Sequence, residues 1–395
     1  MINYKVTRNI VCNYILWWQG LVGEKKYIGK DGVLQYIRHI GCIQYDPVDI
    51  CGKNADIVLQ SRVVEYSKNM LEELLYEQKQ LIDCYDKNLS IIPSSNWKYF
   101  QYAKKNFKEY YKNMKNTELI INDINEKIKR KKYVCSKDIE SEYKTDWGWG
   151  DTKISRVVLE LMHREGELVV HHKIGNIKYY AYAKDYLSNE TFDSQNAFFS
   201  REEYLEWRVY MRIVAVGALW NRGSDAWIGI DMNANERDNA IYNLLQNNKI
   251  VEIHLSDEKF PLYIPEEAEA TFVQIVNGNK NVAARMEFIA PLDSILWDRK
   301  LIEMLFDFNY KWEIYTPSLK RQYGPYILPI LYNDGFIGRI ELIHNKEEKS
   351  LFIKNIWMEK DVEIDSRIKE NYCDCISRFM KFNKCTQING LTNLA

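Results

Sequence analysis

The stretch KISRVVLELMHREGELVVHHKIGNIKYYAY, from Lys153 to Tyr182, decides the fold class of this chain. Its first half carries apolar residues at the spacing of an amphipathic helix, which ends at Gly166. Its second half alternates polar and apolar residues on both sides of Gly175-Asn176, a typical hairpin turn. With a second short helix expected over 136–142, the order helix, helix, hairpin predicts a winged helix, a variant of helix-turn-helix.

The same order of elements recurs further along the chain. Residues 201–219 and 235–247 have helical spacing, and 250–255 with 261–264 form a candidate hairpin. Together with the helices expected in the first hundred residues, this predicts about three divergent helix–helix–hairpin units. From Phe288 onward, three expected strands and a closing helix indicate an α+β region instead.

We therefore predict a mainly α fold made of tandem winged-helix units, with an α+β C-terminal part. The first unit should carry the segment around Gln44 described below, and a Trp147/Trp149 turn should precede the helix of the second. The predicted domains are an N-terminal helical or winged-helix unit, a second and a third winged helix and the C-terminal region, at residues 1–132, 133–195, 196–287 and 288–395.

A second informative stretch is Ile43-Gln44-Tyr45-Asp46-Pro47-Val48-Asp49, which follows a helix expected over 31–41. Pro47 excludes a helix interior and favours an extended conformation at Asp46. In an extended segment Gln44 and Asp46 point to the same side. Such a pair can hold a water molecule and face the positive charge that develops when a glycosidic bond breaks. The alternative is an ordinary Asp-Pro turn.

Composition narrows the class of protein. The formal net charge is −1, so a nucleic-acid partner would need a local basic face. The eight cysteines form no pair of CxxC motifs, and adjacent His171 and His172 should point to opposite faces of a strand, so we predict no metal site. No apolar run is long enough for a bilayer, so we expect no membrane association and a cytoplasmic protein with reduced thiols.

Some basic residues are candidate DNA contacts. In winged-helix proteins the helix before the wing usually enters the major groove and the wing contacts the backbone. This pattern selects Lys153, Arg156, His172 and Lys173, although we favour an ordinary solvated charge for Lys153 and Lys173. The basic run 127–132 is usually a solvated helix face and sometimes contacts phosphate.

The chain resembles the bacterial winged-helix DNA glycosylases of the AlkZ/YcaQ type, which remove alkylated purines and unhook interstrand crosslinks. The longest matching stretch is YKWEIYTPSLKRQYGPYILP, from Tyr310 to Pro329. The family's catalytic signature is Gln-x-Asp or Gln-x-Gln, and Gln44 and Asp46 place this chain in the Gln-x-Asp subgroup. Further matches are Gly41–Val48, Leu59–Arg62, the Trp147/Trp149 turn with its helix and wing, and Pro291–Arg299.

The resemblance implies tandem winged helices that form a concave surface for double-stranded DNA. With it we predict a DNA glycosylase that hydrolyses the N-glycosidic bond of N7-alkylated purines. From the chemistry we hypothesise a monofunctional enzyme without cofactor, and the simplest assumption is that it acts as a monomer. A lysine near C1′ could instead act as a nucleophile, and Lys87 is the residue that could do so. The resemblance assigns catalysis to Gln44 and Asp46, and DNA contacts to residues in the matched stretches: Arg62, Arg299, Lys320, Arg321 and Tyr323.

Two hypotheses from different classes follow. The first is the glycosylase, with interstrand crosslinks as further substrates. The second is a winged-helix DNA-binding protein or regulator without catalysis. The pair Gln44 and Asp46 favours the enzyme, because a regulator has no need for an acid and an amide in a DNA-binding surface.

Overall fold

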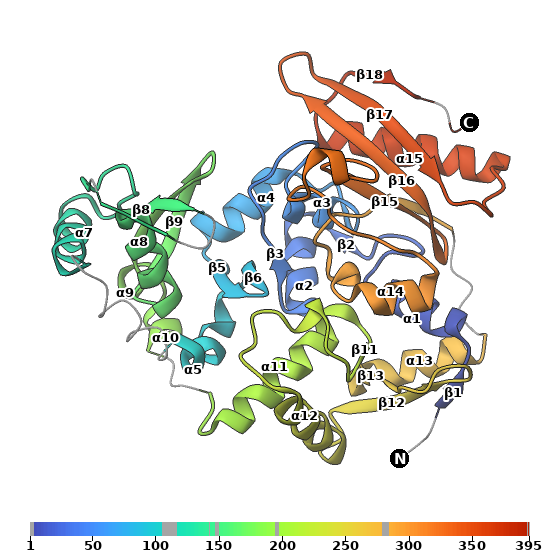
Figure 1. The fold of residues 1–395 in the computed structure, drawn as a ribbon, viewed down its shortest axis with the longest axis horizontal. Coiled ribbons are helices and arrows are strands. Elements are labelled where there is room, and N and C mark those ends of the chain that lie inside the picture. The colour runs from blue at the N-terminus through green and yellow to red at the C-terminus, as the bar shows by residue number, and fades with distance from the viewer. Residues whose placement is uncertain are drawn as a thin grey trace. The chain divides into compact units, whose positions relative to one another are not determined.

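The computed structural model describes residues 4–104, 117–141, 143–146, 150–193, 197–278, 284–392 and 394. The chain divides into two compact units, one formed by Met1–Leu71 with Leu205–Ala395 and the other by Glu72–Tyr204. Helices and strands occur in both units, so the fold is mixed α/β rather than mainly α (Figure 1). The division into four predicted domains stays a prediction.

The stretch around Lys153 lies in the second unit and folds largely as predicted. Helix α8 (Ile154–Glu165) ends at Gly166, whose φ of 84° is in the left-handed region that favours glycine. Strands β9 (Leu168–Ile174) and β10 (Ile177–Tyr182) pair antiparallel across the Gly175 turn. The predicted helix and hairpin are confirmed, whereas their assignment as a winged helix stays a prediction.

The partner of α8 is a different helix from the one predicted. Helix α7 (Thr117–Lys131) packs against α8, and its Ile124 and Ile128 join Val158 and Met162 in one buried cluster. The helix predicted over 136–142 is wrong in its described part, because the chain makes a turn there. The Asp138 carboxylate accepts the Cys135 backbone N–H at 2.8 Å, and this bond favours the turn over a helix.

The other elements of the second unit are short. Strands β5 (Leu81–Asp86) and β6 (Asn88–Pro93) pair antiparallel in a hairpin. Strands β7 (Lys144–Asp146) and β8 (Asp151–Lys153) pair antiparallel. The remaining helices are the π-helix η1 (Glu73–Glu77), the 3-10 helix η2 (Ser94–Phe100), α5 (Gln101–Lys104), α9 (Ala183–Tyr186) and α10 (Asn189–Phe192).

The N-terminal part of the first unit surrounds the Gln44 segment. Its helices are α1 (Arg8–Trp18), α2 (Gly29–Ile40), α3 (Asn54–Gln60) and α4 (Lys68–Glu72). Strands β2 (Tyr27–Ile28) and β4 (Val63–Val64) pair in parallel, and β3 (Ile43–Gln44) follows α2. The helix predicted over 31–41 is confirmed as α2.

A four-stranded sheet continues the first unit in the order β1-β12-β13-β11. The N-terminal strand β1 (Tyr4–Val6) pairs in parallel with β12 (Ile250–Leu255), which forms a hairpin with β13 (Leu262–Pro265). The predicted helices near 201–219 and 235–247 are α11 (Arg201–Val216) and α12 (Ala234–Gln246). The sheet and its helices are completed by β11 (Leu219–Trp220), η3 (Asp225–Trp227), η4 (Glu266–Ala268) and α13 (Glu269–Val276).

The C-terminal region is a five-stranded sheet in the order β14-β15-β16-β17-β18. Register shifts at Ile330/Leu331 and Glu341/Leu342 mark bulges, which bend strands and curl a sheet. Helix α15 (Ser366–Phe382) packs on β14, where the Phe288 and Phe379 rings lie 5.5 Å apart. The remaining elements are β14 (Met286–Phe288), η5 (Ser294–Leu296), α14 (Arg299–Phe306), η6 (Ser318–Lys320), β15 (Ile327–Tyr332), β16 (Gly335–Asn345), β17 (Ser350–Met358) and β18 (Gln387–Gly390).

Candidate functional site

The Gln44 segment begins where α2 ends. Gly41 terminates the helix with a φ of 81°, and its N–H donates to the Ile37 carbonyl. The Gln44 backbone carbonyl then accepts the Asn54 side-chain N–H at 2.8 Å, and the Asn54 carboxamide oxygen accepts the Leu292 N–H. One buried side chain therefore fixes the backbone of Gln44 against a segment more than two hundred residues away in sequence.

The Gln44 side chain is 5% exposed and has an unsatisfied acceptor. Within the described residues, no donor lies within hydrogen-bond distance of its amide oxygen Oε1. A buried polar atom without a partner carries a free-energy cost, which is often tolerated where a ligand or water completes the bond. The Gln44 backbone is thus fixed, and its side-chain oxygen can still accept a hydrogen bond.

Asp46 is half-buried and uses one of its two carboxylate oxygens in a turn. Oδ1 accepts the Val48 N–H at 2.9 Å, which is the capping arrangement expected of an Asp-Pro turn. For Oδ2, the described part of the chain supplies no hydrogen-bond donor. Burial raises the pKa of Asp46, and the Val48 N–H partly opposes that effect. The turn and the functional interpretation are compatible, because one oxygen orients the group and the other remains available.

Asp49, three residues further on, is in a different electrostatic state. Its Oδ2 lies 2.7 Å from the Lys346 ammonium. Burial acts to raise the pKa of Asp49, but the bond with Lys346 and the nearby lysines lower it overall. Asp49 is therefore neutralised by a partner, whereas Asp46 has no ion pair within the residues described.

Arg62 must be removed from the predicted DNA contacts. Its side chain is fully buried, with Nη1 and Nη2 at 2.6 and 2.8 Å from the two Asp293 carboxylate oxygens. Its Nε also donates to the Gln19 carbonyl, and the guanidinium lies against the Tyr36 ring. Because every face of the group is engaged inside the unit, Arg62 has a structural role.

Lys173 is also held by an internal partner. Its Nζ lies 2.6 Å from the Asp83 carboxylate, and both side chains are buried. A phosphate would have to displace Asp83, so the structure does not support the predicted DNA contact at Lys173.

Lys87 is buried at the turn between β5 and β6, where its carbonyl accepts the Ser90 hydroxyl. Lys153 and Arg156 are exposed at the start of α8.

The predicted contacts of the C-terminal region differ in accessibility. Arg299 is half-exposed and pairs with Asp225 at 3.1 Å. Lys320 is exposed, whereas Arg321 donates to the Thr316 and Ile314 carbonyls. Tyr323 is half-buried beside Trp357 and Arg339. Lys320 is therefore exposed and, within the described part of the chain, its side chain has no hydrogen bond or ion pair.

His171 and His172 correct the prediction that adjacent strand residues point to opposite faces. Tyr179 pairs with His172 and Tyr180 pairs with Val170, so His171 is the extra residue of a β-bulge. The bulge brings the two Nδ1 atoms within 2.8 Å of each other. Sequence alternation could not reveal this, because a bulge interrupts the two-residue period.

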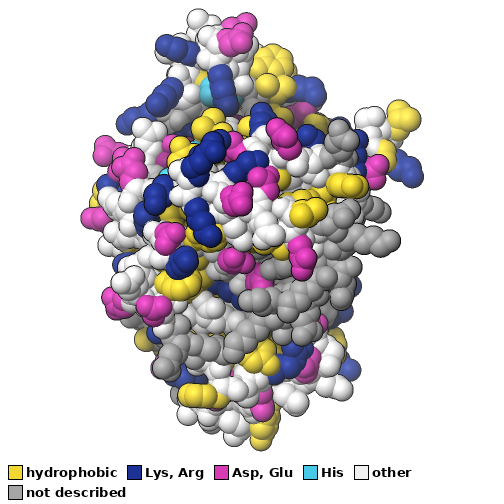
Figure 2. All heavy atoms as spheres, turned by 90° about the vertical axis from the view of Figure 1, so that its left-hand side faces the viewer, with side chains coloured by type: hydrophobic (Ala, Val, Ile, Leu, Met, Phe, Trp, Pro, Cys, Tyr) yellow, Lys and Arg dark blue, Asp and Glu magenta, His cyan; other side chains and the backbone are white. Residues whose placement is uncertain are grey.

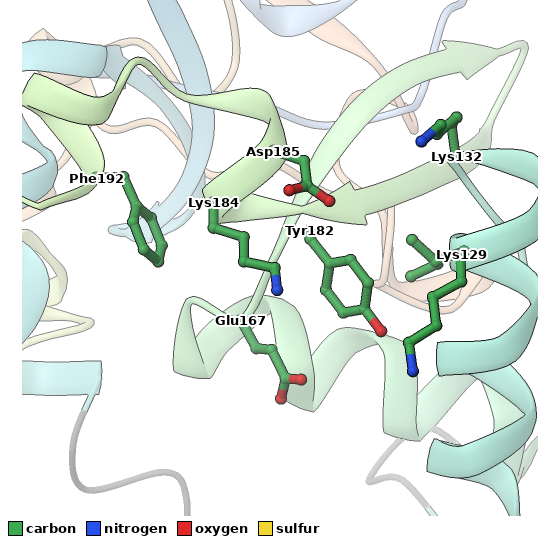
Figure 3. A pocket seen from close by; sticks show the side chains of 8 residues that line it. Lys129, Lys132, Glu167, Tyr182, Lys184, Asp185 and Phe192 are labelled. Carbon is green, nitrogen blue, oxygen red and sulfur yellow. The ribbon is translucent and has the colours of Figure 1, made fainter.

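A pocket of about 400 Å³ lies between the C-terminal end of α7 and the hairpin. In Figure 3, Lys129, Tyr182, Lys184 and Glu167 point into the same opening. The basic run 127–132 gave the signal for Lys129, but nothing in the sequence connected it to Lys184. The pocket is also lined by Ile128, Lys132, Asp185 and Phe192.

Figure 2 shows Lys and Arg side chains gathered over one part of the surface, interspersed with Asp and Glu.

Trp147 and Trp149 lie outside the described residues. Among the residues that the structure does describe, no helix is both long and apolar enough to span a bilayer. No cluster of three or more His, Cys, Asp or Glu side chains in that part of the chain could ligate a metal.

Comparison with known proteins identifies a family by sequence and a similar fold among solved structures. The sequence model described as "DNA glycosylase AlkZ-like" matches residues 37–382. Among solved structures, the Streptomyces sahachiroi DNA glycosylase AlkZ is similar with a TM-score of 0.63 and 10% identity, covering 98% of this chain and 99% of that protein. At this identity the structural likeness shows a common fold, and the family match covers most of the sequence. The chain belongs to the AlkZ-like family of DNA glycosylases.

Proposed function

We propose that this chain is a monofunctional DNA glycosylase that hydrolyses the N-glycosidic bond of N7-alkylated purines in double-stranded DNA. Crosslinks formed through the same purine position are further candidate substrates. The observation that carries the proposal is the Gln44–Asp46 segment, in which a fixed, half-buried carboxylate keeps one oxygen available. Family membership supports the reaction class.

The chemistry requires little from the enzyme at the leaving group. Alkylation at N7 makes the purine a cation, so the base departs with the bonding electrons and without prior protonation. The task is to stabilise the sugar as it becomes oxocarbenium-like and to deliver water to C1′. Ionised Asp46 performs both steps, because its negative charge faces the cation and Oδ2 accepts a proton from the attacking water.

Gln44 has a positioning role in this proposal. Its unsatisfied amide oxygen accepts a hydrogen bond from the attacking water or from the sugar. The buried link through Asn54 holds the Gln44 backbone, from which that side chain extends. Asp46 then receives the water's proton while the C1′–O bond forms, and passes it to solvent. No covalent protein–DNA intermediate is part of this route, and we give Lys87 no catalytic role.

The DNA interface follows from the accessible cations. We propose that the helix–helix–hairpin units are tandem winged helices whose concave surface binds DNA as a monomer. Lys153, Arg156 and Lys320 are exposed and remain proposed backbone contacts, with Arg299 available if its pair with Asp225 opens. Arg321 and Tyr323 support the loop that carries Lys320.

The function is tested by incubating the protein with duplex DNA carrying one N7-methylguanine. We expect abasic sites to accumulate, revealed as strand breaks only after alkali. Binding to the duplex without abasic sites would support a DNA-binding regulator and overturn the enzyme. Borohydride added during the reaction should trap no protein–DNA adduct, and a trapped adduct would contradict the monofunctional mechanism.

The pH dependence of base release should report Asp46. Burial raises its pKa above the ordinary 3.8, and only the ionised form can stabilise the sugar cation. The single-turnover rate should therefore be level near neutrality and decrease on the acid side as pH passes down through that raised pKa. On the acid side of neutrality the N7-methylated base stays cationic, so the substrate adds no titration of its own in that range. A rate that increases steadily on acidification would indicate acid-catalysed base loss instead.

We also propose that the pocket lined by Lys129 and Lys184 belongs to the DNA interface, and this predicts a change in the salt dependence of binding. Substituting both Lys129 and Lys184 by Gln should weaken binding to undamaged DNA. The negative slope of log K against log[salt] should become shallower by about 2, because each lysine would lose one phosphate contact. Lys127→Gln is the matched control, because Lys127 on the same helix is paired with Asp123 at 2.8 Å. An unchanged slope in the double variant would exclude the pocket from the DNA interface.

A further inference from the structure

The loop between Glu313 and Gly324 is fixed by its own side chains. The buried Glu313 carboxylate accepts backbone N–H groups from Gln322, Tyr323 and Gly324, at 2.9 to 3.2 Å. Burial acts to raise the pKa of Glu313, but these three donors hold it below its usual value. From the other side of the loop, the Arg321 guanidinium donates to the Thr316 and Ile314 carbonyls. Hydrogen bonds from both sides therefore restrict the conformation of the loop.

This fixed loop presents an aromatic side chain to solvent. Tyr315 is 66% exposed, although its ring makes an edge contact with Trp312 at 5.5 Å between centroids. Trp312 in turn makes an edge contact with Tyr326 at 6.2 Å. The three rings form a continuous row from the buried Tyr326 to the exposed Tyr315.

The row of rings borders the segment that carries Asp46. The Tyr326 hydroxyl donates to the Gly52 carbonyl at 3.1 Å, which attaches the buried end of the row just beyond Asp49. At the exposed end, burial and then the negative charge of Asp46 raise the pKa of Tyr315. Tyr315 and Asp46 belong to the same compact unit, and the row of rings connects Tyr315 to the backbone just beyond the segment that carries Asp46.

We infer that Tyr315 is a specificity-determining residue, whose ring stacks on the cationic alkylpurine while Asp46 faces the sugar. The inference rests on the proposed function and adds a residue that contacts the base. An aromatic face attracts a cation, and nucleobases stack on exposed aromatic rings. A positively charged purine satisfies both interactions, whereas an unmodified guanine offers stacking alone. The fixed loop lowers the entropy lost when the ring is ordered against the base.

The test separates recognition of damage from general DNA binding. The probe is a duplex with one N7-methylguanine whose sugar carries a 2′-fluorine, which slows bond cleavage, and the reference is the same duplex without the methyl group. Tyr315→Leu should weaken binding to the damaged probe about tenfold more than binding to the reference, because only the damaged base adds the attraction of a cation for the ring. Tyr315→Phe keeps the ring and should retain the preference. Leu319→Ala is the control, because Leu319 is fully exposed on the same loop.

The outcomes distinguish this inference from the proposed function. If wild-type protein releases N7-methylguanine but Tyr315→Leu binds the damaged probe as tightly as wild type, Tyr315 does not contact the base. An equal loss on both duplexes would make Tyr315 a general DNA contact and also overturn the inference. If wild-type protein releases no base, the proposed function itself fails. Matching circular dichroism spectra would show that the variants are folded.

Discussion

Replacing Asp46 with asparagine is expected to slow release of N7-methylguanine about 10²–10⁴-fold, the range typical of a lost general base. Asparagine has the same shape and can still accept the Val48 N–H, so the turn should remain. Its oxygen carries no charge to stabilise the sugar cation and cannot remove a proton from water. DNA affinity should stay close to that of wild type, because a carboxylate contributes nothing favourable to phosphate binding.

The measurement is a single-turnover rate with enzyme in excess, alongside DNA binding by fluorescence anisotropy. Asp49→Asn is the matched control, because that carboxylate is three residues away and is already paired with Lys346. It should retain most activity. Folding of the Asp46 variant should be unimpaired, since burial raises the pKa of Asp46 and the folded state therefore disfavours its charge. Equal rates for Asp46→Asn and wild type would remove Asp46 from catalysis.

Asp293→Ala should lower the free energy of unfolding by about 3–5 kcal/mol, because it leaves the Arg62 guanidinium buried without its counter-charge. The two groups make a bidentate contact, and neither side chain is exposed to solvent. Asp293 also accepts the Ile295 N–H, so the substitution removes a helix cap as well. The effect should appear in denaturant unfolding followed by tryptophan fluorescence.

A half-exposed ion pair in the same unit provides the comparison. Arg299→Ala breaks the pair with Asp225, which should change stability by about 1 kcal/mol or less because water screens exposed pairs. Replacing Arg62 and Asp293 together with Met and Leu should restore part of the loss, since no unpaired charge then remains buried. A loss below about 1 kcal/mol for Asp293→Ala would contradict the structural role assigned to Arg62.

Local patterns predicted local elements well. The helical spacing after Lys153 predicted α8, and the Gly175-Asn176 turn predicted the hairpin that follows it. Both patterns depend only on neighbouring residues. The Asn333-Asp334-Gly335 turn likewise joins β15 and β16. The helix expected over 136–142 was wrong because the Asp138 side chain bonds to the nearby backbone, an alternative that spacing alone does not reveal.

Features that depend on distant partners could not be predicted. Arg62 was predicted as a DNA contact because it lies in a stretch that matches the family. Its burial could not be foreseen, because its partner Asp293 lies 231 positions later. The pairing of β1 with β12 spans a similar separation. For the candidate site, the sequence identified Gln44 and Asp46 through their spacing and the family signature. It could not identify Tyr315, because its contact with Trp312 and the place of this row of rings beside the Asp46 segment arise only from folding.

The most direct test of the central claim is to identify the product of one turnover on a duplex with a single N7-methylguanine. Chromatography with mass detection should find one free N7-methylguanine per damaged site with wild-type protein, while the strand stays intact until alkali is added. The Asp46→Asn protein should bind the same duplex and release almost none. The account is contradicted if wild-type protein binds the duplex at every site and the modified base stays attached to its sugar.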